Sequence, residues 1–106
     1  MGAASDDPRL VGPVLQVGDV AEAILEAIRE DNPGREVITE EHSSYVRILC
    51  PEECVIRCST VAAILGRPFG VTDIETIMSA FSGQIETRDD RIRFFLRRLP
   101  KERSVG

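Results

Sequence analysis

The chain has 106 residues, of which 42% are hydrophobic and 29% are charged, and its formal net charge is −5. This length is typical of a single domain, which buries about 60–70% of the surface that its unfolded chain exposes. The acidic balance argues against a nucleic-acid binder, because such a protein needs a basic face to displace counterions from phosphates. The sequence has no apolar run of membrane-spanning length and no secretory signal pattern at its start, so we expect a cytoplasmic protein.

Three cysteines, Cys50, Cys54 and Cys58, recur at every fourth position. Their odd number, without an export signal, favours free thiols. The spacing differs from the paired spacing of zinc knuckles, and His42 is the only histidine. In a continuous strand all three would share one face, so we expect them to be small apolar fillers of a β-core, with thiol chemistry or metal binding as alternatives.

The N-terminal part predicts a tail and then a strand. Residues 1–10 are small and acidic and contain a proline, which is typical of a disordered tail. Residues 11–17 (VGPVLQV) predict a strand. Pro13 has no N–H group to donate, so it indicates an edge strand or the beginning of a strand.

A long amphipathic helix follows from Asp19. Asp19 is the expected N-cap, and Glu22 would complete a capping box. The sequence Asp31-Asn32-Pro33-Gly34 ends the helix, because proline breaks the hydrogen-bond ladder and glycine accepts left-handed angles. This DNPG loop has two readings, simple helix termination or an exposed loop that contacts a partner.

The middle of the chain predicts strands over residues 36–42, 45–50 and 54–58, joined as a meander of hairpins. Ser59 is the expected N-cap of a short helix that Gly66 ends. A second short helix is expected to begin with a capping box of Thr72 and Glu75 and to run to about Ser79. The chain then bends at residues 81–83 and forms a hairpin of strands 84–87 and 91–96.

These elements follow the order β-α-β-β-β-α-α-β-β, which predicts a compact α+β domain with helices packed on a mixed or antiparallel sheet. We place this single domain at residues 11–98, with a frayed tail at residues 99–106.

The last strand has two unlike faces. One face is apolar and suits a core; it consists of Ile92, Phe94 and Leu96. The other face places an aromatic ring among arginines; it consists of Arg91, Arg93, Phe95 and Arg97. A solvated strand edge is the alternative reading of the second face. The sequence has no glycine-rich phosphate loop and no nucleophile elbow. We therefore expect a protein without catalytic residues that acts by contacting another protein.

The order of six segments, VGPVLQVGD, DNPG, YVRI, LGRPF, SAFSGQI and RIRFF, resembles the effector proteins of bacterial multicomponent diiron monooxygenases. The similarity covers about residues 11–97 and is closest to the toluene monooxygenase branch, with phenol hydroxylase and methane monooxygenase regulatory components more distant. It implies a regulatory subunit that has no cofactor or metal and binds the diiron hydroxylase. Such a subunit tunes active-site conformation, oxygen activation, coupling efficiency and regiospecificity, and works alongside a Rieske ferredoxin and an NADH reductase.

The resemblance also suggests residues that contact the hydroxylase. These partner-contact candidates are Val11, Gly12, Asn32, Pro33, Gly34, Tyr45, Arg47, Ser82, Gly83 and Gln84. Two other functions stay open. A small α+β regulatory domain could bind a small-molecule ligand, and a thiol redox enzyme could use Cys54 or a neighbouring cysteine.

Overall fold

The computed structural model of the chain describes residues 7–96. Its elements are β1 (Leu10–Gln16), α1 (Asp19–Asp31), β2 (Ile38–Glu41), β3 (Tyr45–Pro51), β4 (Glu53–Arg57), α2 (Cys58–Leu65), α3 (Val71–Ile77), β5 (Met78–Ser82), β6 (Gln84–Thr87) and β7 (Arg91–Phe95). The predicted α+β fold class is confirmed. The tails predicted for residues 1–10 and 99–106 lie mostly outside the described residues, as does Arg97, although β1 already begins at Leu10.

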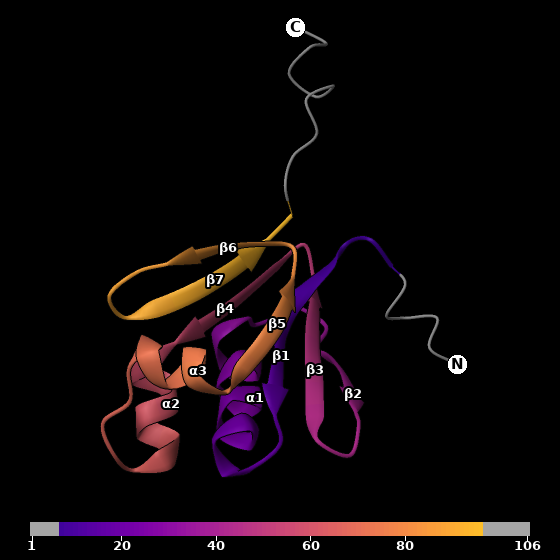
Figure 1. Ribbon diagram of the computed structural model, residues 1–106. Helices are drawn as coiled ribbons and strands as arrows, with labels where there is room; N and C mark the ends of the chain where they lie inside the picture. The colour runs from indigo at the N-terminus through magenta and orange to yellow at the C-terminus, as the bar shows by residue number, and fades with distance from the viewer. Residues whose placement is uncertain (1–6, 97–106) are drawn as a thin grey trace, which may run out of the picture.

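The strands form two sheets in which every pair is antiparallel, in the orders β2-β3-β1-β5 and β4-β7-β6 (Figure 1). The predicted meander is therefore wrong at β3 and β4, which are consecutive but belong to different sheets. Glu52 joins them with a φ of 71°. Its N–H donates to the Arg9 carbonyl at 2.7 Å, and its own carbonyl accepts from Leu96 N–H at 3.1 Å. These bonds hold the junction where the two sheets meet.

The β1 strand is central, so the expectation that Pro13 marks an edge or a strand beginning is wrong. The β1–β3 register includes Val11↔Cys50 and Val14↔Arg47 and leaves Gly12 and Pro13 unpaired with β3. Gly12 lies so close to β3 that an added Cβ would sit 1.9 Å from the Ile48 carbonyl oxygen. Pro13 is tolerated in this central strand because the hydrogen-bond ladder between β1 and β3 is interrupted at residues 12 and 13, so its missing N–H leaves no β3 carbonyl unpaired in a continuous ladder.

The α1 helix begins one residue earlier than expected, with Gly18 as the N-cap, whose carbonyl accepts from Glu22 N–H at 3.1 Å. Asp19 therefore lies in the first turn, where its negative charge still complements the helix dipole. The helix packs against α2 and β4. The core forms between the buried face of this helix and the two sheets. The helix contributes Ala21, Ala23, Ile24, Ala27 and Ile28, and the strands contribute Val11, Leu15, Ile48, Ile56 and Phe94.

The two short helices have caps that differ from the predicted ones. The α2 helix begins at Cys58 and is held by Asp31, whose carboxylate accepts from Arg57 N–H at 2.8 Å and from Thr60 Oγ1 at 2.7 Å, so Ser59 is not its N-cap. The predicted box of Thr72 and Glu75 is also wrong. Instead, the Asp73 carboxylate accepts from Gly70 N–H at 2.8 Å.

The predicted extension of the second short helix to Ser79 is wrong, because α3 ends at Ile77 and Met78 begins a strand. This strand, β5, pairs with β1 and was absent from the predicted order. Gly66 does end α2 in the left-handed conformation, as expected.

The three cysteines are buried as expected, but they do not share one strand face. Cys50 lies in β3, Cys54 in β4, and Cys58 is the first residue of α2. Interaction between the neighbouring thiols of Cys50 and Cys54 raises the pKa of Cys54 and lowers that of Cys50. Burial raises the pKa of Cys58. The chain reverses between β3 and β4, which separates positions that a continuous strand would align.

Candidate partner-contact surface

The structure brings one group of predicted contact residues together where β1 meets β5. Gly12 pairs with Ser82, and Val11 is fully buried. Gly83 follows β5 with a φ of 93°, and an added Cβ there would lie 2.5 Å from Val11 Cγ1 and 2.9 Å from the Phe95 carbonyl oxygen. Val11 and Gly12 therefore shape this corner from inside. Only Gly83 and Gln84 of the group are exposed to solvent.

Arg47 connects three strands on the face of the four-stranded sheet that points away from α1. Its Nη2 donates to Ser82 Oγ on β5 at 3.3 Å, and its Nη1 lies 3.7 Å from Glu40 Oε1 on β2. Its Nε is buried without a hydrogen-bond partner among residues 7–96. Tyr45 lies on the same face and stacks on His42 with ring centroids 4.4 Å apart. Tyr45, Arg47 and Ser82 thus belong to one surface, the outer face of this sheet.

The DNPG loop divides into a structural half and an exposed half. The Asn32 side chain is only 6% exposed. Its Nδ2 donates to the carbonyls of Ile28 at 2.7 Å and Val55 at 2.9 Å, and its Oδ1 accepts from Val55 N–H at 2.9 Å. Asn32 therefore pairs with β4 much as a neighbouring strand would. Pro33 and Gly34 are exposed, and they are the part of the loop that a partner could reach.

The arginine face of β7 is partly neutralised by its neighbours. Arg93 pairs with Glu53 of β4 and lies 3.3 Å from Glu86 Oε1 of β6. Its guanidinium also covers the Phe95 ring, 4.3 Å from the centroid. The hydrogen bond from Arg88 is the main cause that lowers the pKa of Glu86. The aromatic side chain predicted among arginines, Phe95, is therefore covered by Arg93, whose charge is paired with two glutamates. Arg91, on the same face, has no ion pair among the described residues.

Sequence reasoning missed the β5 strand and, with it, the exposed side chain of Phe81 at the edge of the sheet. Phe81 on this strand is 42% exposed and, with Val17 at 49%, is one of two exposed large hydrophobic side chains among residues 7–96. Its ring centroid lies 5.7 Å from that of buried Phe94. Residues 77–84 carry no charge in a chain that is 29% charged, and this gap was the available signal. Exposed edge strands usually carry charges that block pairing, so an uncharged edge indicates a contact surface.

Within residues 7–96, no group of three or more His, Cys, Asp or Glu side chains is arranged to hold a metal ion. In the same part of the chain, every helix is too short or too polar to cross a membrane. The geometry thus presents two contact-capable areas, the outer face of the four-stranded sheet with its β5 edge and the exposed half of the DNPG loop.

Comparisons with known proteins give consistent matches. Residues 9–95 match the MmoB/DmpM family. The effector subunit of the alkene monooxygenase system of Xanthobacter autotrophicus (strain ATCC BAA-1158 / Py2) is 39% identical over 89 residues, which are 84% of this chain and 88% of that protein. The stimulatory component DmpM of phenol 2-monooxygenase from Pseudomonas sp. (strain CF600) is 32% identical over 82 residues, 77% of this chain and 89% of that protein.

Solved structures agree with these sequence matches. A chain of a phenol hydroxylase–regulatory protein complex superposes with a TM-score of 0.73 at 26% identity and covers 83% of this chain and 99% of its own length. The regulatory protein B of soluble methane monooxygenase shares the fold, with a TM-score of 0.67 at 22% identity over 92% of this chain and 72% of its own. The family match spans nearly all of the described residues and the two curated relatives exceed 30% identity, so the chain belongs to the MmoB/DmpM family.

Proposed function

We propose that this protein is the effector subunit of a multicomponent monooxygenase, which binds the diiron hydroxylase and regulates it without catalysing a reaction itself. The observation that carries the proposal is the family match over residues 9–95. The superposition on a chain from a phenol hydroxylase–regulatory protein complex supports hydroxylase binding, because that similarity extends to 26% sequence identity as well as fold. A protein of this kind acts by binding one conformation of its partner more tightly than another.

The contact surface that we propose is the β5 edge with the adjoining outer face of the four-stranded sheet. At this edge Phe81 is exposed with its ring toward Phe94 on the core side, whereas the next residue, Ser82, points to the outer face, where Arg47 donates to it. Aromatic residues that become buried are frequent anchors of protein interfaces, and a rim of fixed polar groups adds specificity. Pro33 and Gly34 of the DNPG loop, together with Gln84, form further contacts in this proposal.

The finer parts of the function follow from the same resemblance. The effector would tune oxygen activation, coupling of NADH use to product, and regiospecificity, in a cytoplasmic system with a Rieske ferredoxin and an NADH reductase. We propose an aromatic hydrocarbon such as toluene as the substrate of the hydroxylase. Because the named relatives serve an alkene and a phenol monooxygenase, alkenes and phenols are the comparison substrates.

Reconstitution tests the function directly. The purified protein is titrated into its hydroxylase, reductase and ferredoxin, and product formed per NADH consumed is measured with toluene, phenol and a small alkene. We expect the yield per NADH to rise and saturate with effector concentration, and the product distribution to change. Unchanged yield and distribution over the whole titration would refute the proposal.

A pair of substitutions tests the surface. Phe81→Ala should raise the half-saturating effector concentration by about tenfold, the loss expected for truncation of a moderate interface anchor. Val17→Ala removes a similarly exposed apolar side chain from the β1–α1 turn and serves as the matched control, with an expected change below about twofold. Equal responses of the two variants would place the interface elsewhere.

A further inference from the structure

Three arginines form a row across the outer face of the three-stranded sheet. Arg57 of β4 lies directly opposite Arg91 of β7 in the strand register. Arg88, just after β6, donates its N–H to the Arg91 carbonyl at 2.9 Å, which places it opposite Arg91 on the other side. Residues opposite each other in neighbouring strands point to the same face, so all three side chains lie on one surface.

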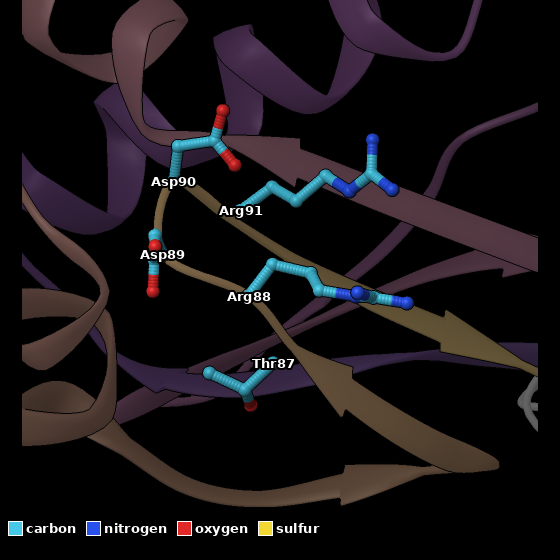
Figure 2. A pocket seen from close by; sticks show the side chains of 5 residues that line it. All are labelled: Thr87, Arg88, Asp89, Asp90 and Arg91. Atoms are coloured by element: carbon cyan, nitrogen blue, oxygen red, sulfur yellow. The ribbon is translucent and has the colours of Figure 1, made fainter.

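The close view of the β6–β7 hairpin shows how these groups lie (Figure 2). The side chains of Arg88 and Arg91 run alongside each other in the same direction, whereas the carboxylate of Asp89 points away from them. The hairpin residues 87–91 also line an open hollow of about 740 Å³. Within residues 7–96, neither Asp89 nor Asp90 lies within ion-pair distance of these arginines, so the two acids of the turn do not pair with the row.

The pairing of these arginines is incomplete. Arg88 forms an ion pair with Glu86 at 2.7 Å. Arg57 and Arg91 have no ion pair within residues 7–96, and Arg91 Nε is buried without a hydrogen-bond partner there. The next row of the same face differs, because Arg93 sits between Glu53 and Glu86. Like charges that face each other across strands destabilise a sheet, so the fold itself gains nothing from placing Arg57 opposite Arg91.

We infer that this arginine row, Arg57, Arg91 and Arg88, is a docking patch for an acidic helix of the hydroxylase; the inference rests on the proposed function. The chain is acidic overall, and this row of three arginines is a local basic exception. Charge complementarity therefore favours an acidic segment of the partner as its occupant. Neighbouring strands lie about 4.8 Å apart, which nearly matches the spacing of about 5–6 Å between residues one turn apart on a helix. Carboxylates at successive turns can therefore pair with guanidiniums on successive strands, and arginine suits such bidentate contacts.

Charge-neutralising variants test the docking patch. The double variant Arg57→Gln/Arg91→Gln is compared with Arg29→Gln/Arg67→Gln, which makes the same change in net charge at exposed positions of α1 and the α2–α3 loop. Affinity for the hydroxylase is measured by fluorescence titration as ionic strength rises from about 0.1 M toward 1 M, over which the Debye length falls from about 10 to 3 Å.

At low salt we expect the docking-patch variant to bind about tenfold more weakly, about threefold per arginine, and the control to change less than twofold. The difference should disappear at high salt. The thermal midpoint of the docking-patch variant should be equal to or above that of the wild type, and the single exposed change Arg57→Gln gives the same test with the least structural risk.

The outcomes separate this inference from the proposed function. If the wild-type protein stimulates the hydroxylase but the two double variants bind with equal affinity and equal salt dependence, the docking patch is refuted and the function stands. If the wild-type protein neither binds nor stimulates the hydroxylase, the proposed function fails and the inference fails with it.

Discussion

The buried amide of Asn32 makes the sharpest stability prediction. Replacing Asn32 with alanine removes three side-chain hydrogen bonds, two that join the end of α1 to Val55 of β4 and one to the Ile28 carbonyl within α1. Each bond contributes about 0.5–1.5 kcal/mol net, and the carbonyls of Ile28 and Val55 lose a donor in a largely buried place. We therefore expect a loss of about 3 kcal/mol, or about 12–24 °C in the thermal midpoint of a domain this size.

Circular dichroism during urea and thermal unfolding measures this loss. Pro33→Ala is the matched control, because Pro33 is the next residue and is exposed, and it should change the unfolding free energy by less than about 0.5 kcal/mol. Asn32→Asp keeps the acceptor for Val55 N–H but sets a carboxylate against two carbonyl oxygens, so it should also destabilise the fold. An Asn32→Ala variant within 0.5 kcal/mol of the wild type would refute the view that this amide joins helix and strand.

Three further predictions concern other parts of the fold. Gly83→Ala should cost more than about 2 kcal/mol in urea unfolding, whereas Gly34→Ala, which has open space but a φ of 78°, should cost about 1 kcal/mol. The Cys54 thiol, buried and with a raised pKa, should react with a disulfide reagent only at the rate of unfolding; rapid labelling at neutral pH would contradict this. The folded-state pKa of Glu86 lies below its ordinary 4.5, mainly because Arg88 donates to it. The stability that the ionised Glu86 carboxylate contributes is therefore fully present above about pH 4.5 and is lost as pH falls through the lowered folded-state pKa. Comparison of Glu86→Gln with the wild type in urea at neutral pH and at about pH 3 checks this, since the difference should shrink in acid.

Local patterns predicted several elements because the decisive interactions were local. The apolar spacing of α1 and the glycine after α2 depend on residues within one or two turns, and both were found. The alternation of β7 also gave the correct core face, since Ile92 and Phe94 are fully buried. These features follow from period and from backbone angles, which neighbouring residues largely determine.

The errors arose where distant partners decide the structure. The β5 strand follows α3 without a turn residue, and it forms only because β1 offers a free side to pair with. β3 and β4 resemble a hairpin in sequence, yet each finds its partner elsewhere, β3 in β1 and β2, and β4 in β7. No local pattern distinguishes a strand that turns back on its neighbour from one that leaves for a second sheet.

The prediction of contact residues also depended on interactions between residues that are distant in the sequence. Composition could not show that Asn32 is turned inward to β4 or that Val11 and Gly12 lie in a central strand. The arginine row also depends on register, because Arg57 and Arg91 are far apart in sequence and become neighbours only when β4 pairs with β7. Phe81 was visible in the sequence, but its exposure follows from the position of β5 at the sheet edge.

The central place of β1 has a consequence for how the chain reaches its native state. Residues 10–16 emerge early in synthesis, yet their partners end at residues 51 and 82. The larger sheet therefore cannot close until most of the polypeptide has left the ribosome, and contacts between such distant residues slow folding. A nascent chain that stops before β5 would leave one side of an apolar strand without its partner, a state in which pairing with another chain competes with correct folding.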